Sequence, residues 1–304
     1  MSEHIHEVLK VVLGVVIPVA SFATGLTAAS ADPLWLTKHP RLLLRSLLII
    51  LLVIPVGVVL VMEAIGTPAV VKAALTIAIL SIGIGPPAAF KQARAQTNVV
   101  AYEVGLNLTL LALALVYLPL AVAVHGAIFH HTVQLGVGQI AGVVLVKAII
   151  PMVLGVLAGR LFPKMVAPFA RYASIVVQVV LLAIVVMALI VTRHQLLALG
   201  TTWLLCLAIV AAEIAVGHVA GRKEPETRSM LVAFSAMRFP ALALLIVAAA
   251  PRGREFVPVV LAYVLCSFVL VALYQGMSAR RAKRGEPAPR PTAARGQAAA
   301  AGHA

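Results

Sequence analysis

The stretch AIGTPAVVKAALTIAILSIGIGPPAAFKQARAQTNVVAY, residues 64–102, contains no aspartate or glutamate. A second acid-free stretch, SMLVAFSAMRFPALALLIVAAAPRGR, occupies residues 229–254. Each is long enough to cross the hydrocarbon core of a bilayer as a helix, which requires about 20 apolar residues. Both stretches are therefore expected to lie in a membrane.

Each of these stretches is interrupted by residues that break helices. Gly85, Pro86 and Pro87 follow one another in the first, and Pro240 lies two residues after Arg238 in the second. Proline removes a backbone N–H and clashes with the preceding turn, so both helices should be broken, a simple proline kink being the alternative. Non-helical backbone at membrane depth is stable only where it is buried in protein or lines a cavity. A pair of broken helices is typical of transporters with a solute site near the middle of the membrane.

The composition of the whole chain agrees with a membrane protein. Of 304 residues, 62% are hydrophobic and 11% are charged, which is too apolar for a surface that faces water on all sides. The apolar residues fall into about nine blocks of transmembrane length, so we expect an all-α, polytopic membrane protein. The blocks are 6–29, 40–62, 67–96, 98–124, 134–161, 165–192, 196–220, 226–250 and 254–278.

The distribution of basic residues predicts the orientation. The net charge of +14 does not indicate nucleic-acid binding, because lysine and arginine lie mainly between the apolar blocks and in the tail. When nine blocks alternate across the membrane, these residues concentrate on one side, which the positive-inside rule makes cytoplasmic. We therefore expect a multi-pass protein of the plasma (inner) membrane with its N-terminus outside and its C-terminus cytoplasmic. Residues 279–304 read as a disordered basic cytoplasmic tail.

The two broken segments occupy corresponding places in two halves of the chain. In each half a span with proline or small residues precedes the broken span and an unbroken span follows it. The halves are displaced by five spans, so they cross the membrane in opposite senses, which predicts an inverted repeat. The matching blocks are 40–62, 67–96 and 98–124 in one half and 196–220, 226–250 and 254–278 in the other.

Several short motifs occur in order between residues 8 and 278. They are Phe22-x-x-Gly25-Leu26-Thr27 followed by Lys38-His39-Pro40, the break at Gly85-Pro86, Lys147-x-x-x-Pro151-x-x-x-Gly155, and the second break around Met237. In this order and spacing the chain resembles the bile acid:sodium symporter family. The resemblance implies a transmembrane domain, here residues 1–278, in which a panel domain moves against a core domain with two crossing broken helices. The core would comprise about 40–124 and 196–278, and the panel about 6–29 and 134–192.

The chain departs from this family where the family binds sodium. The resemblance places the family's oxygen-bearing ligands on Ala89, Phe90, Phe234, Arg238 and Ile50, and the serine and threonine of the helix after the first break on Glu103 and Asn107. Sodium is a hard cation and needs several oxygen ligands. We therefore expect no bound cofactor and transport that does not depend on sodium; an ordinary sodium-coupled organic anion symporter is the alternative.

Two cations at membrane depth, Lys91 and Arg238, should each have a carboxylate partner, because an uncompensated charge is costly there. Glu103 and Glu213 are the carboxylates available. In the family's geometry Glu103 lies beside the crossing, near Asn107, so it would pair with Arg238 or Lys91 and protein cations would replace sodium. Either carboxylate could instead bind the proton that drives transport. For Glu213, a basic partner on its own helix and a place at the domain interface are further alternatives.

The predicted function is secondary active transport of a small organic anion by alternating access. Broken helices present free N–H groups and positive dipole ends to anions, and nearby cations strengthen that preference. If internal carboxylates neutralise both cations, a neutral solute is the alternative. A non-transporting membrane sensor or scaffold that keeps the fold is the alternative from another class.

The chain shows no pattern that indicates an enzyme or a metal site. It has no nucleophile with a positioned base and no phosphate-binding loop. His125, His130 and His131 lack accompanying ligands at diagnostic spacing, so they read as part of a solvated loop. The expected partners are the lipid bilayer and the solute, and no residue pattern specifies the solute, the direction of transport or the oligomeric state.

Overall fold

The computed structural model of the chain describes residues 2–28, 35–81, 97–129, 137–162, 176, 179–180, 183, 186–187, 189–223, 225–249 and 253–283. Within these residues every regular element is a helix, which confirms the all-α prediction. The α-helices are α1 (Ser2–Ala28), α2 (Pro40–Leu48), α3 (Ile54–Ala64), α4 (Ala69–Leu80), α6 (Thr97–Phe129), α7 (Val137–Val144), α8 (Ile150–Leu161), α10 (Thr202–Ala220), α11 (Pro225–Ala236), α12 (Pro240–Ala249) and α13 (Gly253–Lys283). Two π-helical segments are η2 (Ile49–Val53) and η3 (Leu145–Ile149), and two 3₁₀ turns are η1 (Leu36–Lys38) and η4 (Gly221–Lys223).

Five helices in the described part of the chain are long and apolar enough to cross a membrane. Large apolar side chains stand exposed on them, such as Leu60, which is 61% exposed, and Leu204, which is 68% exposed. Such surfaces are compatible with a protein embedded in lipid. The five helices are Pro40–Ala64, Ala101–Ala121, Ala141–Leu161, Thr202–Lys223 and Glu255–Arg280.

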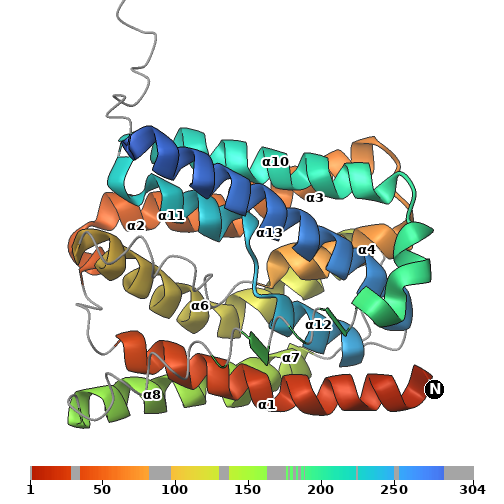
Figure 1. Cartoon of the computed structure of the whole chain (residues 1–304), viewed down its shortest axis with the longest axis horizontal. Coiled ribbons are helices and arrows are strands. Elements are labelled where there is room, and N and C mark those ends of the chain that lie inside the picture. Colours follow the sequence, from red (N-terminus) through yellow and green to blue (C-terminus); the bar gives the residue numbers. More distant parts are fainter. Residues whose placement is uncertain are drawn as a thin grey trace, which may run out of the picture.

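The helices form layers, and the interrupted pair α11 and α12 lies between the outer helices. Helices α1 and α8 pack along one edge of the molecule, and α10 packs on α13 and α3 at the opposite edge (Figure 1). Between these edges, α4 contacts α13 and α12, while α6 contacts α11 and α4. This arrangement puts the interruption between α11 and α12 inside the molecule.

The break predicted at Pro240 is observed. Helix α11 ends at Ala236, Met237–Phe239 are not helical, and α12 begins at Pro240. A residue before proline is disfavoured in the helical conformation, and proline is well suited to the first position of a helix. The sequence Phe239-Pro240 therefore ends one helix and starts the next.

The end of α4 meets this break. Ser81 follows the last residue of α4, and its carbonyl accepts a hydrogen bond from the Phe239 backbone N–H at 3.0 Å. One freed backbone group of the break is thus satisfied by the other acid-free stretch. Gly85, Pro86, Pro87 and Lys91, on which the first predicted break depends, lie outside the described residues.

Two motif glycines lie where α1 packs closely on α8. A Cβ atom on Gly155 of α8 would lie 2.2 Å from the carbonyl oxygen of Phe22 in α1. A Cβ atom on Gly25 would lie 2.2 Å from the carbonyl oxygen of Met152. Only glycine allows the two backbones to approach so closely, which explains why these positions lack side chains.

Candidate functional site

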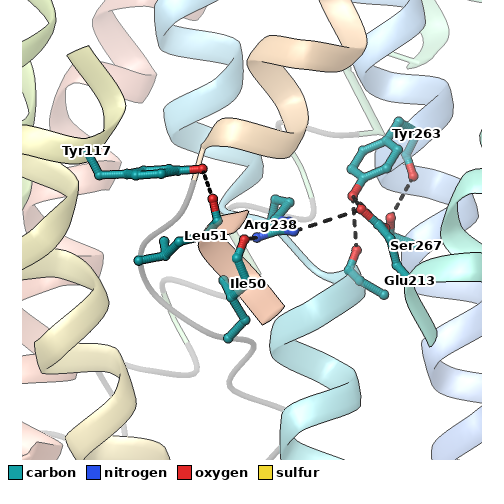
Figure 2. Close-up of polar contacts among 8 residues, drawn as sticks. Ile50, Leu51, Tyr117, Glu213, Arg238, Tyr263 and Ser267 are labelled. Atoms are coloured by element: carbon teal, nitrogen blue, oxygen red, sulfur yellow. Dashed lines mark hydrogen bonds and ion pairs between the residues drawn. The ribbon is translucent and has the colours of Figure 1, made fainter. Parts of the chain in front are cut away.

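Arg238 lies in the break between α11 and α12, and its side chain is only 3% exposed. It points between η2 on one side and α10 on the other (Figure 2). The Nη1 atom of Arg238 donates a hydrogen bond to the carbonyl oxygen of Ile50 at 3.4 Å. The non-helical segment therefore places a guanidinium group in the interior, beside the irregular part of the Pro40–Ala64 span.

A proline leaves one of the acceptors in this region without its backbone donor. In the π-helical segment η2 a backbone N–H bonds five residues back, as that of Ile54 does to Ile49, so Pro55, which has no N–H, leaves the Ile50 carbonyl without a donor. Arg238 donates to this carbonyl, and the Tyr117 hydroxyl of α6 donates to the neighbouring Leu51 carbonyl at 2.7 Å. Freed backbone groups in a membrane protein must find such partners because lipid offers none.

Glu213 is the carboxylate that faces Arg238. It lies on the buried face of α10, which it shares with Cys206, Ile209, Val210 and Gly217 at helical spacing. Its side chain is 1% exposed, and its Oε1 atom is 3.9 Å from Nη2 of Arg238. This distance gives electrostatic attraction without a hydrogen bond.

Tyr263 of α13 holds this carboxylate from the opposite side. Its hydroxyl group lies 2.9 Å from Oε2 and 3.1 Å from Oε1 of Glu213, and it donates its single hydrogen to the carboxylate. The same hydroxyl lies 3.4 Å from the carbonyl oxygen of Ala236, the last residue of α11. Ser267, one turn after Tyr263, donates to the Tyr263 carbonyl at 2.9 Å (Figure 2).

The site thus combines one buried cation and one buried anion. Removing two charges from water is costly, and their attraction offsets this cost only when hydrogen bonds also satisfy them. Glu213 has Tyr263 as a donor, but the Nε and Nη2 atoms of Arg238 make no hydrogen bond among the described residues. The guanidinium group therefore keeps donors available for another acceptor.

The structure pairs Arg238 with a different carboxylate from the one the family geometry suggested. We expected Glu103 to pair with Arg238 or with Lys91, whereas the ion pair that Arg238 makes among the described residues is with Glu213. The reason is the packing of α10 against both α11 and α13, which places the buried face of α10 beside the break. Glu213 also has its basic partner on another segment rather than on its own helix.

Glu103 lies elsewhere in the interior, on α6. It is 1% exposed, and its Oε2 atom makes no hydrogen bond with any described residue. Asn107, one turn later, is also buried. The proposed pair between Glu103 and Lys91 cannot be placed, since Lys91 is outside the described residues. Met237, which completes the second break, is half-buried and packs against the hydrophobic core.

The two tyrosines of the site were missed by sequence reasoning. Tyr117 and Tyr263 stand inside apolar runs, where aromatic residues read as ordinary packing. The chain has five tyrosines, and a hydroxyl group at membrane depth must donate to something. That requirement is the signal that could have identified Tyr117 as a partner for a freed carbonyl and Tyr263 as a partner for a carboxylate.

The described residues contain no group of three or more histidine, cysteine, aspartate or glutamate side chains that could hold a metal ion. Comparison with known proteins finds no protein-family model that matches this chain. No curated protein matches it either. The resemblance to the bile acid:sodium symporters therefore rests on the short motifs alone.

Proposed function

We propose that this protein is a secondary transporter that carries a small organic anion across the membrane by alternating access, without sodium. The observation that carries the proposal is Arg238, a buried guanidinium group at the helix break whose Nε and Nη2 atoms have no acceptor among the residues that the structure describes. Ionisable groups in such places are rare and usually belong to a solute or ion pathway. An arginine favours carboxylate, sulfonate or sulfate groups as ligands.

The absence of a sodium requirement follows from the same residue. The resemblance places a sodium-ligating glutamine of the family at Arg238, and a guanidinium group there repels a cation instead of binding it. The position of a second such glutamine is Ile50, whose carbonyl oxygen is the acceptor for Arg238. A protein cation that crosslinks the break to η2 would take over the structural part of what sodium does in the family.

The proposal includes an architecture of nine spans with an inverted repeat, the N-terminus outside and the C-terminus cytoplasmic. The close contact of α1 with α8 supports a panel that moves as one body, and the contacts of α10 with α11 and α13 support a separate core. The observed break at Met237–Phe239, beside the end of α4, supports a crossing of two broken helices.

The test is uptake into proteoliposomes that contain the purified protein. A panel of organic carboxylates, sulfonates and sulfate esters is offered with sodium, with potassium, and with an imposed pH gradient. We expect uptake of at least one anion at the same rate in sodium and potassium. Arg238→Gln should abolish it, while Arg193→Gln should not, because Arg193 is exposed at the end of a helix.

Two results would contradict the proposal. Uptake that requires sodium and is indifferent to Arg238→Gln would favour the ordinary sodium-coupled symporter. Solute binding that stabilises the protein without any uptake, under every gradient, would favour a sensor or scaffold.

A further inference from the structure

One edge of the Arg238 guanidinium group is unoccupied by hydrogen-bond acceptors among the described residues. Nη1 donates to Ile50, but Nε and Nη2 do not donate to any of them. In a guanidinium group the Nε–H bond and one Nη2–H bond are parallel and lie on one edge. This edge fits the two oxygens of a carboxylate in a bidentate arrangement.

Glu213 does not fill this edge. Its nearest oxygen is 3.9 Å from Nη2, which is beyond hydrogen-bond distance. Both of its oxygens lie within reach of the Tyr263 hydroxyl instead. Arg238 thus has a counter-charge but lacks the hydrogen bonds that a buried arginine normally makes.

We propose that the Nε–Nη2 edge of Arg238 binds the carboxylate of the transported solute, and that Glu213 takes up one proton when this solute binds. The inference rests on the proposed function and assigns its coupling ion. Before binding, the site holds one cation and one anion. A solute carboxylate adds a negative charge, and a proton on Glu213 restores neutrality, so one anion and one proton bind together.

The proton balance uses groups that the structure already places together. A proton from solution forms an O–H bond at Glu213, while Arg238 stays protonated and donates to the solute. The hydroxyl group of the protonated Glu213 can donate to the oxygen of Tyr263, 2.9 Å away. The Tyr263 hydroxyl can then turn its hydrogen to the carbonyl oxygen of Ala236, 3.4 Å away. The Glu213 carboxyl group and the Tyr263 hydroxyl group therefore each keep a hydrogen-bond partner in both states, whereas Nε and Nη2 of Arg238 gain theirs only when the solute binds.

Few charged or titratable groups face Glu213 from the elements packed around α10. The segment after α11 contributes Arg238, and α13 contributes Tyr263, while η2 contributes none. The other titratable or charged side chains that the structure describes on these elements have other contacts or positions. Cys206 and Cys266 are buried free thiols, His218 bonds to Tyr274, and Glu63 of α3 bonds to Lys72. Arg228 lies beside Gly221, and Arg222 and Lys223 of η4 and Glu255 and Arg280 of α13 are exposed. Arg238 and Tyr263 therefore set the protonation of Glu213.

The experiment measures binding and proton uptake in detergent, with potassium formate as the probe. Formate is a carboxylate without a side chain, so it tests the guanidinium edge rather than the fit of a larger solute, and formamide is its neutral control. We expect uptake of one proton per formate bound and a formate affinity that falls by about tenfold per pH unit as the pH rises. Infrared difference spectra should show a protonated carboxylic acid on binding.

Three variants separate the parts of the proposal. Glu213→Gln mimics the protonated acid, so formate should bind without proton uptake, without pH dependence and without the infrared band. Arg238→Lys keeps the charge but loses the parallel donors, so the affinity should fall at least about tenfold. Glu63→Gln, in a second ion pair of the protein, should change neither measurement.

Formate binding without proton uptake, equal proton uptake in Glu213→Gln, or no formate binding in the folded wild-type protein would overturn the inference. Because the measurement needs no transport, these results leave the proteoliposome experiment to judge the proposed function separately. Thermal unfolding of each variant shows that it is folded before its binding is compared.

Discussion

In the region around Arg238 and in the α1–α8 pair, a basic side chain donates to a backbone carbonyl group that a proline has left without its donor. In both, a proline inside a membrane-depth helix leaves a carbonyl group without its backbone donor. Near Arg238 the proline is Pro55, and the freed carbonyl of Ile50 accepts from the guanidinium group. In the α1–α8 pair the proline is Pro18, and the carbonyl of Gly14, four residues earlier, accepts from the Lys147 Nζ atom at 3.2 Å.

The two cations differ in their burial, in their counter-charge and in the number of donors that have no acceptor. Lys147 of η3 is half-buried, and its described hydrogen bond is to the Gly14 carbonyl of α1. Its side chain therefore replaces the backbone donor that α1 lacks. Arg238 is almost fully buried and faces Glu213, and its Nε and Nη2 atoms donate to no acceptor in the described part of the chain. A basic residue in an apolar helix is therefore not by itself a sign of function. The signal is a buried cation with a counter-charge and unsatisfied donors.

The largest expected effect comes from removing the counter-charge. Glu213→Leu should lower the free energy of unfolding by about 3–5 kcal/mol, because it leaves Arg238 as an uncompensated buried charge. The double variant Glu213→Leu/Arg238→Met should recover most of this loss. The measurement is thermal or denaturant-induced unfolding in detergent. If the double variant is no more stable than Glu213→Leu alone, the pair is not coupled.

An intermediate effect is expected at the α1–α8 contact. Gly155→Ala should destabilise the protein by about 1–3 kcal/mol, because the new methyl group would lie 2.2 Å from the Phe22 carbonyl oxygen. Gly57→Ala is the matched control, since a Cβ atom there meets no atom within 4 Å. It should be neutral or slightly stabilising, as alanine favours a helix. Equal unfolding midpoints for the two variants would refute the close packing.

The smallest effect is expected at Lys147. Lys147→Met should lower the free energy of unfolding by about 1 kcal/mol through the lost hydrogen bond to Gly14. Pro18→Ala gives that carbonyl a backbone donor again, so the same lysine change should matter less in the Pro18→Ala background. A double-mutant cycle measures this coupling. If Lys147→Met lowered the free energy of unfolding as much as Glu213→Leu does, the two regions would not differ in the way described above.

Much of the helical framework could be predicted from local residue patterns. The predicted blocks 40–62 and 254–278 correspond to Pro40–Ala64 and to α13, because apolar length and boundary residues act locally. The break at Pro240 was predicted for the same reason. The π-helical segments before Pro55 and Pro151 were not predicted, since the direction in which a helix relaxes at a proline depends on the partners of the freed carbonyls.

The sequence identified the charged residues of the site but not how they pair. Arg238 and Glu213 were both identified as costly charges that need partners, but their pairing with each other was not. They are on separate segments, and Tyr263 comes from a third, α13. Which carboxylate meets which cation depends on how helices rotate and pack, and no residue spacing along the chain encodes that directly.

The sequence alone therefore determined that the chain is an apolar, all-helical protein, that a helix is interrupted at Phe239-Pro240, and that buried charges require compensation. These follow from the cost of exposing backbone and charge to lipid, which every residue experiences locally. The tertiary structure was needed to show that Glu213 and Tyr263 lie beside Arg238 and that its Nε–Nη2 edge has no acceptor among the described residues. That outcome depends on α10, α11 and α13 packing at one depth, because side-chain hydrogen bonds form only when helices distant in sequence come within a few ångströms of each other.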